Sequence, residues 1–201
     1  MSEIVVQKFG GTSVGTVDRI DSVAEIIKNA SKSNKIVVVV SAMGGETNRL
    51  VDLAKAFGDD PDKREFDALV STGETVSSAL LTMALHSKGV KAKSFSASQI
   101  SMRTTSSYSK AKILDVDAKK ILDVVENDTI PIITGFQGVT EGGDVTTLGR
   151  GGSDTTAVAI AAQIEAIRCD IYTDVDGIFT TDPSVVPNAK KLDSITMEEM
   201  L

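Results

Sequence analysis

Short apolar runs alternate along the chain with longer stretches in which apolar residues recur every three or four positions. Val37–Val40 is apolar at every position, as expected for a strand that is covered on both faces. The strand-like runs are Ile4–Val6, Ile36–Val40, Ile130–Ile133 and Ile167–Tyr172, with a weaker one at Lys91–Phe95. The helix-like stretches are Val17–Ala30, Thr47–Phe57, Arg64–Ser87, Ala118–Glu126 and Thr155–Ile164. This alternation predicts an α/β fold, a three-layer sandwich with a mainly parallel central sheet.

Three further segments add detail to this plan. Glu141–Asp144 predicts a hairpin turn between the short strands Gln137–Thr140 and Val145–Leu148. The Ser/Thr-rich stretch Ser101–Ser109 is predicted to be a mobile loop. Thr196–Glu199 has the spacing of a capping box, which marks the start of a helix, and the sequence ends two residues later. We therefore expect one domain over residues 1–201 that is truncated at its C-terminus.

Composition narrows the class of protein. The 201 residues carry 21 Lys and Arg against 28 Asp and Glu, a net charge of −7, and no basic stripe. This balance argues against nucleic-acid binding. No apolar run approaches the roughly 18 residues of a membrane span, and the N-terminus lacks a signal-peptide pattern. The single Cys169 cannot form an internal disulfide. These features favour a cytoplasmic protein that contacts neither nucleic acid nor membrane.

Two glycine-rich turns carry the candidate chemistry. Lys8–Ser13 lies between the first strand and the first helix, and Gly149–Thr156 opens the last helix. Glycines let the backbone approach an anion, and the free amides and dipole of a helix N-terminus favour negative charge. Arg150 offers a two-pronged donor for a carboxylate or phosphate. Asp154 could bind a metal, orient a lysine or take up a proton.

These turns predict a phosphate-binding site that follows neither of the two common glycine-rich sequence patterns. The P-loop pattern is absent from the chain, and no dinucleotide-binding fingerprint follows the first strand. Other segments rich in Gly, Ser, Thr and acids lie at strand ends or turns: Ser41–Asn48, Ser71–Glu74, Thr134–Gly138 and Thr173–Gly177. Ligands of open α/β sheets sit outside the carboxyl ends of the strands. The pattern therefore predicts one ligand crevice at that edge.

Taken in order, these motifs resemble the catalytic domain of the aspartate kinases, within the amino acid kinase family. The matching segments are Val6–Val14, Ser41–Gly44, Ser71–Glu74, Gly135–Gly138, Thr146–Asp154 and Tyr172–Pro183. They span nearly the whole sequence. The resemblance implies an amino acid kinase catalytic domain over residues 1–201 that is incomplete and lacks the C-terminal regulatory ACT domains. It also implies a homodimer.

The resemblance implies a reaction in which ATP, bound with Mg²⁺, phosphorylates the side-chain carboxylate of L-aspartate. The products are 4-phospho-L-aspartate and ADP, in the first step toward lysine, threonine and methionine. A carboxylate is already ionised at neutral pH, so no general base is needed and catalysis rests on alignment and charge neutralisation. The implied catalytic residues are Lys8, which would contact the transferring phosphoryl group, and Asp154, which would position Lys8.

Substrate recognition follows from the same resemblance. Arg150 would bind a carboxylate of aspartate, the α-carboxylate in the first instance, and Glu74 would bind the α-ammonium. The other implied aspartate contacts are the hydroxyls of Ser41, Thr47, Thr147 and Ser153, with Phe136 lining the pocket. Three of the implied aspartate contacts have a competing structural interpretation. Glu74 could merely cap or solvate its helix. Thr47 is equally suited to be the N-cap of the helix that follows, and Phe136 to lie in the core.

The implied nucleotide contacts divide into two groups. Lys8, Phe9, Gly10 and Gly11 would meet the phosphates, and Thr173, Asp174, Phe179 and Asp182 would lie near the adenosine; no metal-binding residue is expected. Two positions depart from the family pattern. Phe179 replaces a Tyr, and Ser184 replaces an Arg that reaches the ATP phosphates. We expect the second change to weaken nucleotide binding unless Lys190 or Lys191 supplies the charge.

Two other functions remain open. One is a sibling kinase that acts on glutamate, N-acetylglutamate or a nucleoside monophosphate, although the turn from Arg150 to Asp154 and Glu74 argue against it. The other is a truncated module that binds aspartate or nucleotide with little or no turnover. The incomplete C-terminus and Ser184 favour this second alternative.

Overall fold

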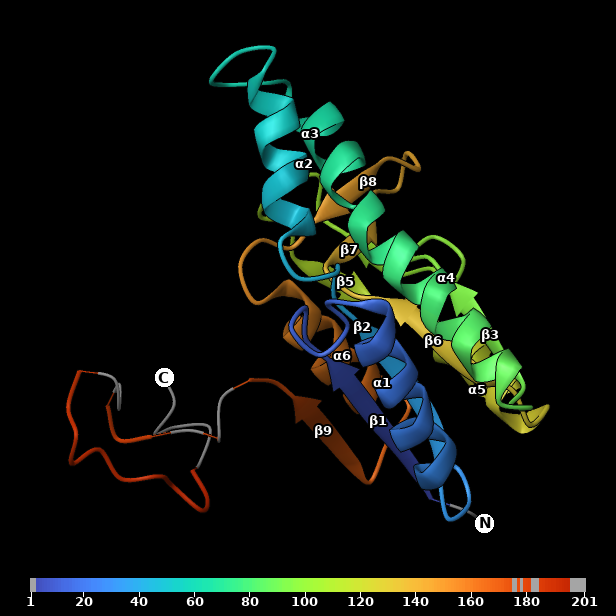
Figure 1. The fold of residues 1–201 in the computed structure, drawn as a ribbon. Coiled ribbons are helices and arrows are strands. Elements are labelled where there is room, and N and C mark those ends of the chain that lie inside the picture. Colours follow the sequence, from blue (N-terminus) through green and yellow to red (C-terminus); the bar gives the residue numbers. More distant parts are fainter. Residues whose placement is uncertain (1–2, 175–176, 178, 182–184, 196–201) are drawn as a thin grey trace.

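The computed structural model describes residues 3–174, 177, 179–181 and 185–195, and its centre is a parallel five-stranded sheet (Figure 1). The strand order is β3-β6-β2-β1-β9, with bounds β1 Ile4–Phe9, β2 Lys35–Val40, β3 Ala92–Phe95, β6 Ile130–Thr134 and β9 Arg168–Tyr172. Every neighbouring pair runs parallel. All five strands were predicted from the apolar runs, with bounds that differ by at most three residues at either end. The mainly parallel sheet is confirmed.

Helices cover both faces of this sheet. On one face lie α1 Val17–Ala30 and α4 Thr72–Ser87, and on the other lie α5 Ala118–Glu126 and α6 Gly152–Gln163. The apolar side chains of β2 divide between two cores: Val38 and Val40 pack toward α1 and α4, while Val37 and Val39 pack toward α5 and α6. Because both faces are covered, β2 needs apolar residues at every position. The three-layer sandwich is confirmed.

A smaller sheet lies beyond the carboxyl ends of the central strands. Its order is β5-β4-β7-β8, with bounds β4 Arg103–Thr104, β5 Ile113–Asp115, β7 Gln137–Val139 and β8 Val145–Thr147. The predicted hairpin of β7 and β8 is confirmed. The prediction of a mobile loop over Ser101–Ser109 was wrong, because this stretch contains β4, and Ser109 is bound to Asp67.

The helix predicted over Arg64–Ser87 is divided at Ser71 into α3 Lys63–Val70 and α4. Another helix, α2 Glu46–Lys55, packs beside α3 (Figure 1). Taken together, α3 and α4 form the helical stretch Lys63–Ser87. In the described part of the chain it is the one helical stretch that is long and apolar enough to cross a membrane. Half of its most apolar window is buried inside the fold. A helix that packs in this way, with the buried acids Asp67 and Glu74, has the character of a core helix.

The carboxyl ends of adjacent strands are joined by their first turn residues. Gly10 N donates to Tyr172 O at 3.0 Å, Ser41 N donates to Phe9 O at 3.1 Å, and Gly135 N donates to Val40 O at 2.9 Å. The chain passes from β1 to β2 on one side and reaches β9 on the other side of β1. Such a reversal of strand order opens a crevice at the carboxyl edge. The predicted capping box at Thr196–Glu199 lies outside the described residues.

Candidate active site

A cavity of about 600 Å³ opens at the carboxyl ends of β1 and β2. Its volume is in the usual range of small-molecule sites, roughly 300–1,000 Å³. The sheet edge brings residues from six separate segments of the sequence together there. The predicted site residues that line it are Lys8, Gly11, Ser41, Thr47, Glu74, Phe136, Thr147, Arg150, Ser153 and Asp154. The crevice predicted from the strand ends is therefore present, although Thr173 and Asp174 of the predicted set do not line it.

Lys8 and Asp154 form an ion pair in the wall of the cavity. The Lys8 Nζ atom lies 2.7 Å from Asp154 Oδ1, and the lysine side chain is 8% exposed against 46% for the aspartate. A buried ammonium needs a charged partner to offset its lost hydration. Lys8 comes from the end of β1 and Asp154 from the first turn of α6, so the pair holds the lysine at the junction of strand and helix.

The start of α6 faces the same cavity. Its N-cap is Gly151, at φ 74°, which has no side chain with which to cap the helix. In the first turn, Gly152 N donates to Gly149 O at 3.0 Å and Asp154 N to Gly151 O at 3.1 Å, which leaves the Ser153 amide for an anionic ligand. The turn after β6 packs closely against this helix start, because a Cβ added to Gly135 would lie 2.7 Å from the side chain of Ser153. Only glycine permits that approach.

Glu74 places a carboxylate in the wall of the cavity from α4. Its Oε1 accepts a hydrogen bond from Ala42 N at 3.1 Å, whereas the buried Oε2 has no partner among the described residues. Burial raises the pKa of Glu74 to about 7, and backbone hydrogen bonds oppose this shift only in part. A buried, half-satisfied carboxylate suits a cationic ligand, because an ammonium group would satisfy the free oxygen and favour the charged form.

Arg150 supplies the opposite charge from the turn before α6. Its side chain is exposed and lines the cavity, and it pairs with no carboxylate in the described ranges. A free guanidinium can bind a carboxylate through two parallel hydrogen bonds. Arg150 and Glu74 together give the cavity one anionic and one cationic recognition group. This combination matches the two charged groups of an α-amino acid.

The predicted hydroxyl groups differ in the hydrogen bonds that they can form with a ligand. Thr47 is not the N-cap of α2, which is Gly45 at φ 82°, so its hydroxyl is not occupied by capping. Thr147 donates its hydroxyl hydrogen to Asp67 Oδ1 at 2.9 Å. A hydroxyl carries one hydrogen, so Thr147 can only accept a hydrogen bond from a ligand. It therefore suits an ammonium better than a carboxylate.

Two predicted aromatic contacts have different outcomes. Phe136 is half-buried and lines the cavity at φ 68°, so the alternative of a core position does not apply. Phe9 is fully buried and stacks on Tyr172 with ring centroids 4.5 Å apart. The Phe9 side chain belongs to the core beneath the turn. Phe9 is absent from the cavity lining, and its backbone carbonyl accepts from Ser41 N at 3.1 Å.

The predicted adenosine contacts do not line the cavity. Thr173 and Asp174 are exposed just after β9, near the cavity edge because Gly10 bonds to the preceding carbonyl. Phe179 instead pairs with Lys191 in an antiparallel bridge in the segment that extends away from the sheet (Figure 1). Asp182 and Ser184 lie outside the described residues. In the described part of the chain, predicted phosphate contacts and predicted amino-acid contacts therefore line one cavity. The predicted adenosine contacts in that part do not line it.

Several residues of the cavity were missed by the sequence reasoning. Phe66 and Val70 of α3 line it, as does Ser109. Phe66 and Val70 are four residues apart and so share one helix face, but that spacing equally fits an ordinary core contact. Ser109 was assigned to a loop. No sequence signal distinguished these residues.

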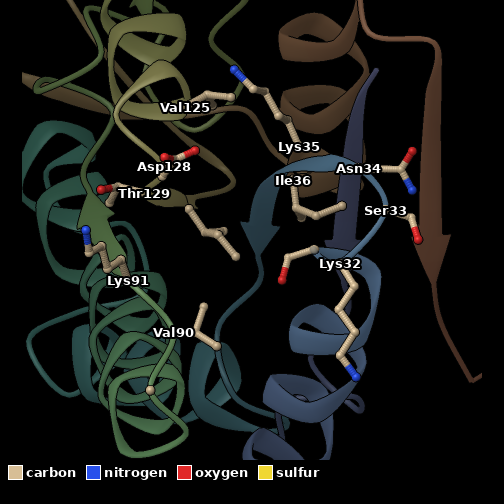
Figure 2. A pocket seen from close by; sticks show the side chains of 13 residues that line it. Lys32, Ser33, Asn34, Lys35, Ile36, Val90, Lys91, Val125, Asp128 and Thr129 are labelled. Atoms are coloured by element: carbon tan, nitrogen blue, oxygen red, sulfur yellow. The ribbon is translucent and has the colours of Figure 1, made fainter. Parts of the chain in front are cut away.

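A second cavity, of about 510 Å³, opens near the amino ends of β2 and β6. Its basic residues are Lys32, Lys35 and Lys91. Figure 2 shows their side chains pointing in different directions, with Asp128 among them. Lys32 is already bonded to Asn29 at 2.7 Å. This cavity has charge but no set of groups directed at a common point, so the carboxyl-end cavity is the candidate active site.

The chain belongs to the amino acid kinase family, whose model matches residues 3–201. An aspartate kinase of Pseudomonas putida is 56% identical over 199 residues, which cover 98% of this chain and 48% of that protein. The crystal structure of E. coli aspartokinase III in complex with aspartate and ADP matches with a TM-score of 0.86 and 32% identity, covering 95% of this chain and 54% of that one. Aspartate kinase from Synechocystis matches with a TM-score of 0.79 and 47% identity, covering 92% and 31%.

These relatives are longer than the chain. An aspartokinase of Geobacillus stearothermophilus is 54% identical, and the match again covers 98% of this chain but 49% of the relative. The chain spans about half the length of the curated relatives it matches.

Proposed function

We propose that residues 1–201 belong to the catalytic domain of an aspartate kinase, which transfers the γ-phosphoryl group of ATP to the side-chain carboxylate of L-aspartate. One observation carries the proposal: the Lys8–Asp154 ion pair lies in the same cavity as Arg150 and the half-satisfied Glu74. The relatives named aspartate kinase, and the matching structure with aspartate and ADP, support this assignment.

The phosphoryl acceptor, L-aspartate, is bound through its α-carboxylate and α-ammonium groups. Arg150 binds the α-carboxylate in a two-pronged pair, and Glu74 binds the α-ammonium with help from the acceptor oxygen of Thr147. Ser41, Thr47 and Ser153 supply further polar contacts, and Phe136 bounds the pocket. Fixing both ends of the amino acid leaves the side-chain carboxylate free to face Lys8. Chain length then becomes the basis of selectivity, because a longer acid would place its carboxylate one methylene too far.

The reaction is a direct displacement. A side-chain carboxylate oxygen forms a bond to the γ-phosphorus while the bond from that phosphorus to the β–γ bridging oxygen breaks, so ADP leaves with the electron pair. Lys8 stabilises the transferring phosphoryl oxygens, assisted by the amide of Gly11 and by the start of α6, whereas the Gly10 amide is engaged with Tyr172 O at 3.0 Å and shapes the turn. Asp154 positions Lys8. The carboxylate is already ionised, so no residue needs to remove a proton.

The nucleotide enters with Mg²⁺, which is held mainly by its phosphates. No cluster of three or more metal-ligating side chains occurs in the part of the chain that the structure describes. Mg²⁺ commonly keeps several waters and uses one or two carboxylates beside substrate phosphates, so it would be held chiefly by the nucleotide and by water. Thr173, Asp174, Phe179 and Asp182 are the proposed adenosine side. Ser184 is expected to lower ATP affinity relative to an Arg.

The proposal extends to the setting of the enzyme. It acts in the cytoplasm as a homodimer, on the route to lysine, threonine and methionine. The regulatory ACT domains lie outside residues 1–201. The net charge of −7 supports a protein that acts on small metabolites rather than on nucleic acid.

The proposal is tested by ADP formation from ATP in the full-length protein, with L-aspartate, L-glutamate, N-acetyl-L-glutamate and a nucleoside monophosphate as acceptors. We expect L-aspartate to exceed the others in kcat/KM by about tenfold or more, as one methylene allows. Hydroxylamine should trap the acyl phosphate. A preference for another acceptor would replace aspartate kinase with a sibling kinase.

The same protein distinguishes catalysis from binding alone. Calorimetry with ADP and L-aspartate, run beside the turnover assay, measures whether both ligands bind. Binding of both ligands without ADP formation would contradict the proposal and favour a binding module.

A further inference from the structure

Asp67 is a buried acid that the catalytic scheme leaves unused. It lies in α3, is 0% exposed, and is absent from the cavity lining. A buried carboxylate is costly unless its oxygens are fully hydrogen-bonded. The structure meets this need with four donors, and all four come from only two residues, Ser109 and Thr147.

The four hydrogen bonds are sorted by donor type. Asp67 Oδ2 accepts from the backbone amides of Ser109 and Thr147, both at 2.8 Å. Oδ1 accepts from the two hydroxyls, at 3.0 Å from Ser109 and 2.9 Å from Thr147. Asp67 therefore binds both Ser109 and Thr147 through the backbone amide and the side-chain hydroxyl of each residue. This arrangement fixes the position and the rotation of both residues against α3.

The two residues that Asp67 binds are part of the substrate cavity. Ser109 and Thr147 line it, and Arg150 follows Thr147 by three residues. Between them, Gly149 at φ 81° lies against Ser109, whose carbonyl oxygen would be 3.2 Å from an added Cβ. Ala111 N also donates to Thr147 O at 2.9 Å. The base of the Arg150 turn is therefore held by the segment that Asp67 fixes.

We propose that Asp67 is a positioning residue for the acceptor pocket, which it organises by clamping the loop at Ser109 and the end of β8 onto α3. It touches neither the substrate nor the reacting atoms. Its effect reaches the acceptor through Thr147 and Arg150. The proposal rests on the proposed function for the identity of the acceptor, but the clamp itself is a property of the described residues.

The arrangement makes Asp67→Asn an informative variant. A carboxamide oxygen in the place of Oδ2 can still accept from both amides. Its NH₂ group, in the place of Oδ1, can donate to both hydroxyl oxygens, because hydroxyl hydrogens rotate. Asp67→Asn therefore keeps four hydrogen bonds, whereas Asp67→Ala keeps none.

The experiment compares the two Asp67 variants with Ser109→Ala, which removes one donor, and with Thr146→Val as control. Thr146 neighbours Thr147 on β8, and its hydroxyl is paired with Thr104 at 2.6 Å in a buried contact away from the cavity lining. Kinetics in the full-length protein give KM for L-aspartate, KM for ATP and kcat. Hydrogen exchange gives the protection of residues 105–112 and 145–152.

We expect Asp67→Ala to raise the aspartate KM by about tenfold or more, as loss of charged hydrogen bonds allows, with a smaller change in the ATP KM. It should also speed exchange in both segments. Asp67→Asn should lie between wild type and Asp67→Ala, and Ser109→Ala should raise the aspartate KM by a few-fold. Thr146→Val should lower Tm without changing the aspartate KM.

Three results would overturn the clamp. They are an unchanged aspartate KM in Asp67→Ala, an equal rise in Thr146→Val, and exchange in Asp67→Asn as fast as in Asp67→Ala. If Asp67→Ala does not fold, an unchanged aspartate KM in Ser109→Ala overturns it instead. If wild type neither binds nor uses aspartate, the proposed function fails, and the exchange data still decide the clamp.

Discussion

The two ends of the central sheet carry cavities of similar volume and different organisation. The carboxyl-end cavity, about 600 Å³, contains Lys8 in a 2.7 Å ion pair with Asp154, and Glu74 with one free oxygen. The amino-end cavity, about 510 Å³, contains Lys35 and Lys91, whose side chains point apart. Volume and positive charge are therefore common to both. The difference lies in whether the charged groups are buried and directed at one point.

Sheet topology produces this difference. At the carboxyl end, turns from β1, β2 and β6 begin side by side, and the start of α6 packs against one of them. At the amino end the helices finish, and their last residues bond to their own neighbourhood: His86 Nε2 lies 2.8 Å from Ala92 O, and Lys88 pairs with Asp21 at 2.8 Å. A functional site needs groups held in a fixed relation to one another. Only the carboxyl end supplies that relation.

The largest expected effect is on kcat, and it should differ between two lysines of the same sheet. Lys8→Ala should lower kcat by about 10³-fold, because the group that neutralises the transferring phosphoryl is lost. Lys35→Ala, at the amino end of the adjacent strand, should leave kcat unchanged. ADP formation in the full-length protein measures both. Near-normal turnover in Lys8→Ala would remove the catalytic role, and an equal loss in Lys35→Ala would remove the contrast between the ends.

A second pair of variants tests amino-acid recognition. Arg150→Ala should raise the aspartate KM by roughly 30- to 700-fold, which corresponds to about 2–4 kcal/mol for a lost two-pronged ion pair. Arg168→Ala, at the start of β9, removes an exposed guanidinium paired with Asp170 at 2.7 Å and should change KM little. Steady-state kinetics at saturating ATP measure both values. A normal aspartate KM in Arg150→Ala would move this residue to a nucleotide or structural role.

The pKa of Glu74 gives a third test. Burial raises this pKa to about 7, and only the carboxylate form can bind an ammonium. Aspartate affinity should therefore fall as pH drops below 7, by up to about tenfold per pH unit. Calorimetry in buffers of different ionisation enthalpy should also detect proton release on binding near pH 7. Glu74→Gln should bind weakly at every pH, and a wild-type affinity that ignores pH between 5 and 8 would contradict this role.

The same raised pKa affects stability in the empty protein. Between pH 4.5 and about 7 the folded state holds a proton on Glu74 that the unfolded state has released. The free energy of unfolding should therefore decrease as pH rises through this window, by on the order of 3 kcal/mol from this group. Glu74→Gln should lack that part of the slope. Urea titrations at several pH values, compared between the two proteins, measure it.

The smallest effect is expected at the amino end. Replacing Lys32, Lys35 and Lys91 together by Ala should change aspartate and ATP KM values by less than about twofold and stability by about 0.5 kcal/mol per site or less. Kinetics and Tm measure these changes. A rise in either KM of tenfold or more would show that the second cavity takes part in the reaction.

Much of this organisation could be predicted from local patterns. The continuous run Val37–Val40 indicated a strand covered on both faces, and the alternation of strands and helices indicated the parallel sheet. The rule for ligands in parallel sheets then places Lys8, Glu74 and Arg150 at one edge from the sequence alone. These inferences succeeded because each depended on short-range periodicity or on topology.

Other features depended on tertiary contacts that leave no local mark. β4 and β5 have two and three residues, too few for a period-two pattern to be recognised. Asp67 looks like one polar residue on an amphipathic helix, although it is buried by contacts with residues 42 and 80 positions away. Phe9 belongs to a motif that meets ligands, yet its side chain packs in the core.

The Lys8–Asp154 pair also bears on how substrates arrive. The Lys8 ammonium is matched by a carboxylate 2.7 Å away, so the pair projects little field into solvent. The chain as a whole carries a charge of −7, and both proposed substrates are anions. Among the cationic groups of the cavity, the exposed Arg150 is then the one that can attract these anions at a distance, while the net negative charge of the chain repels them. Added salt should screen both contributions, so the association rate should depend only weakly on ionic strength, unlike that of an electrostatically steered enzyme.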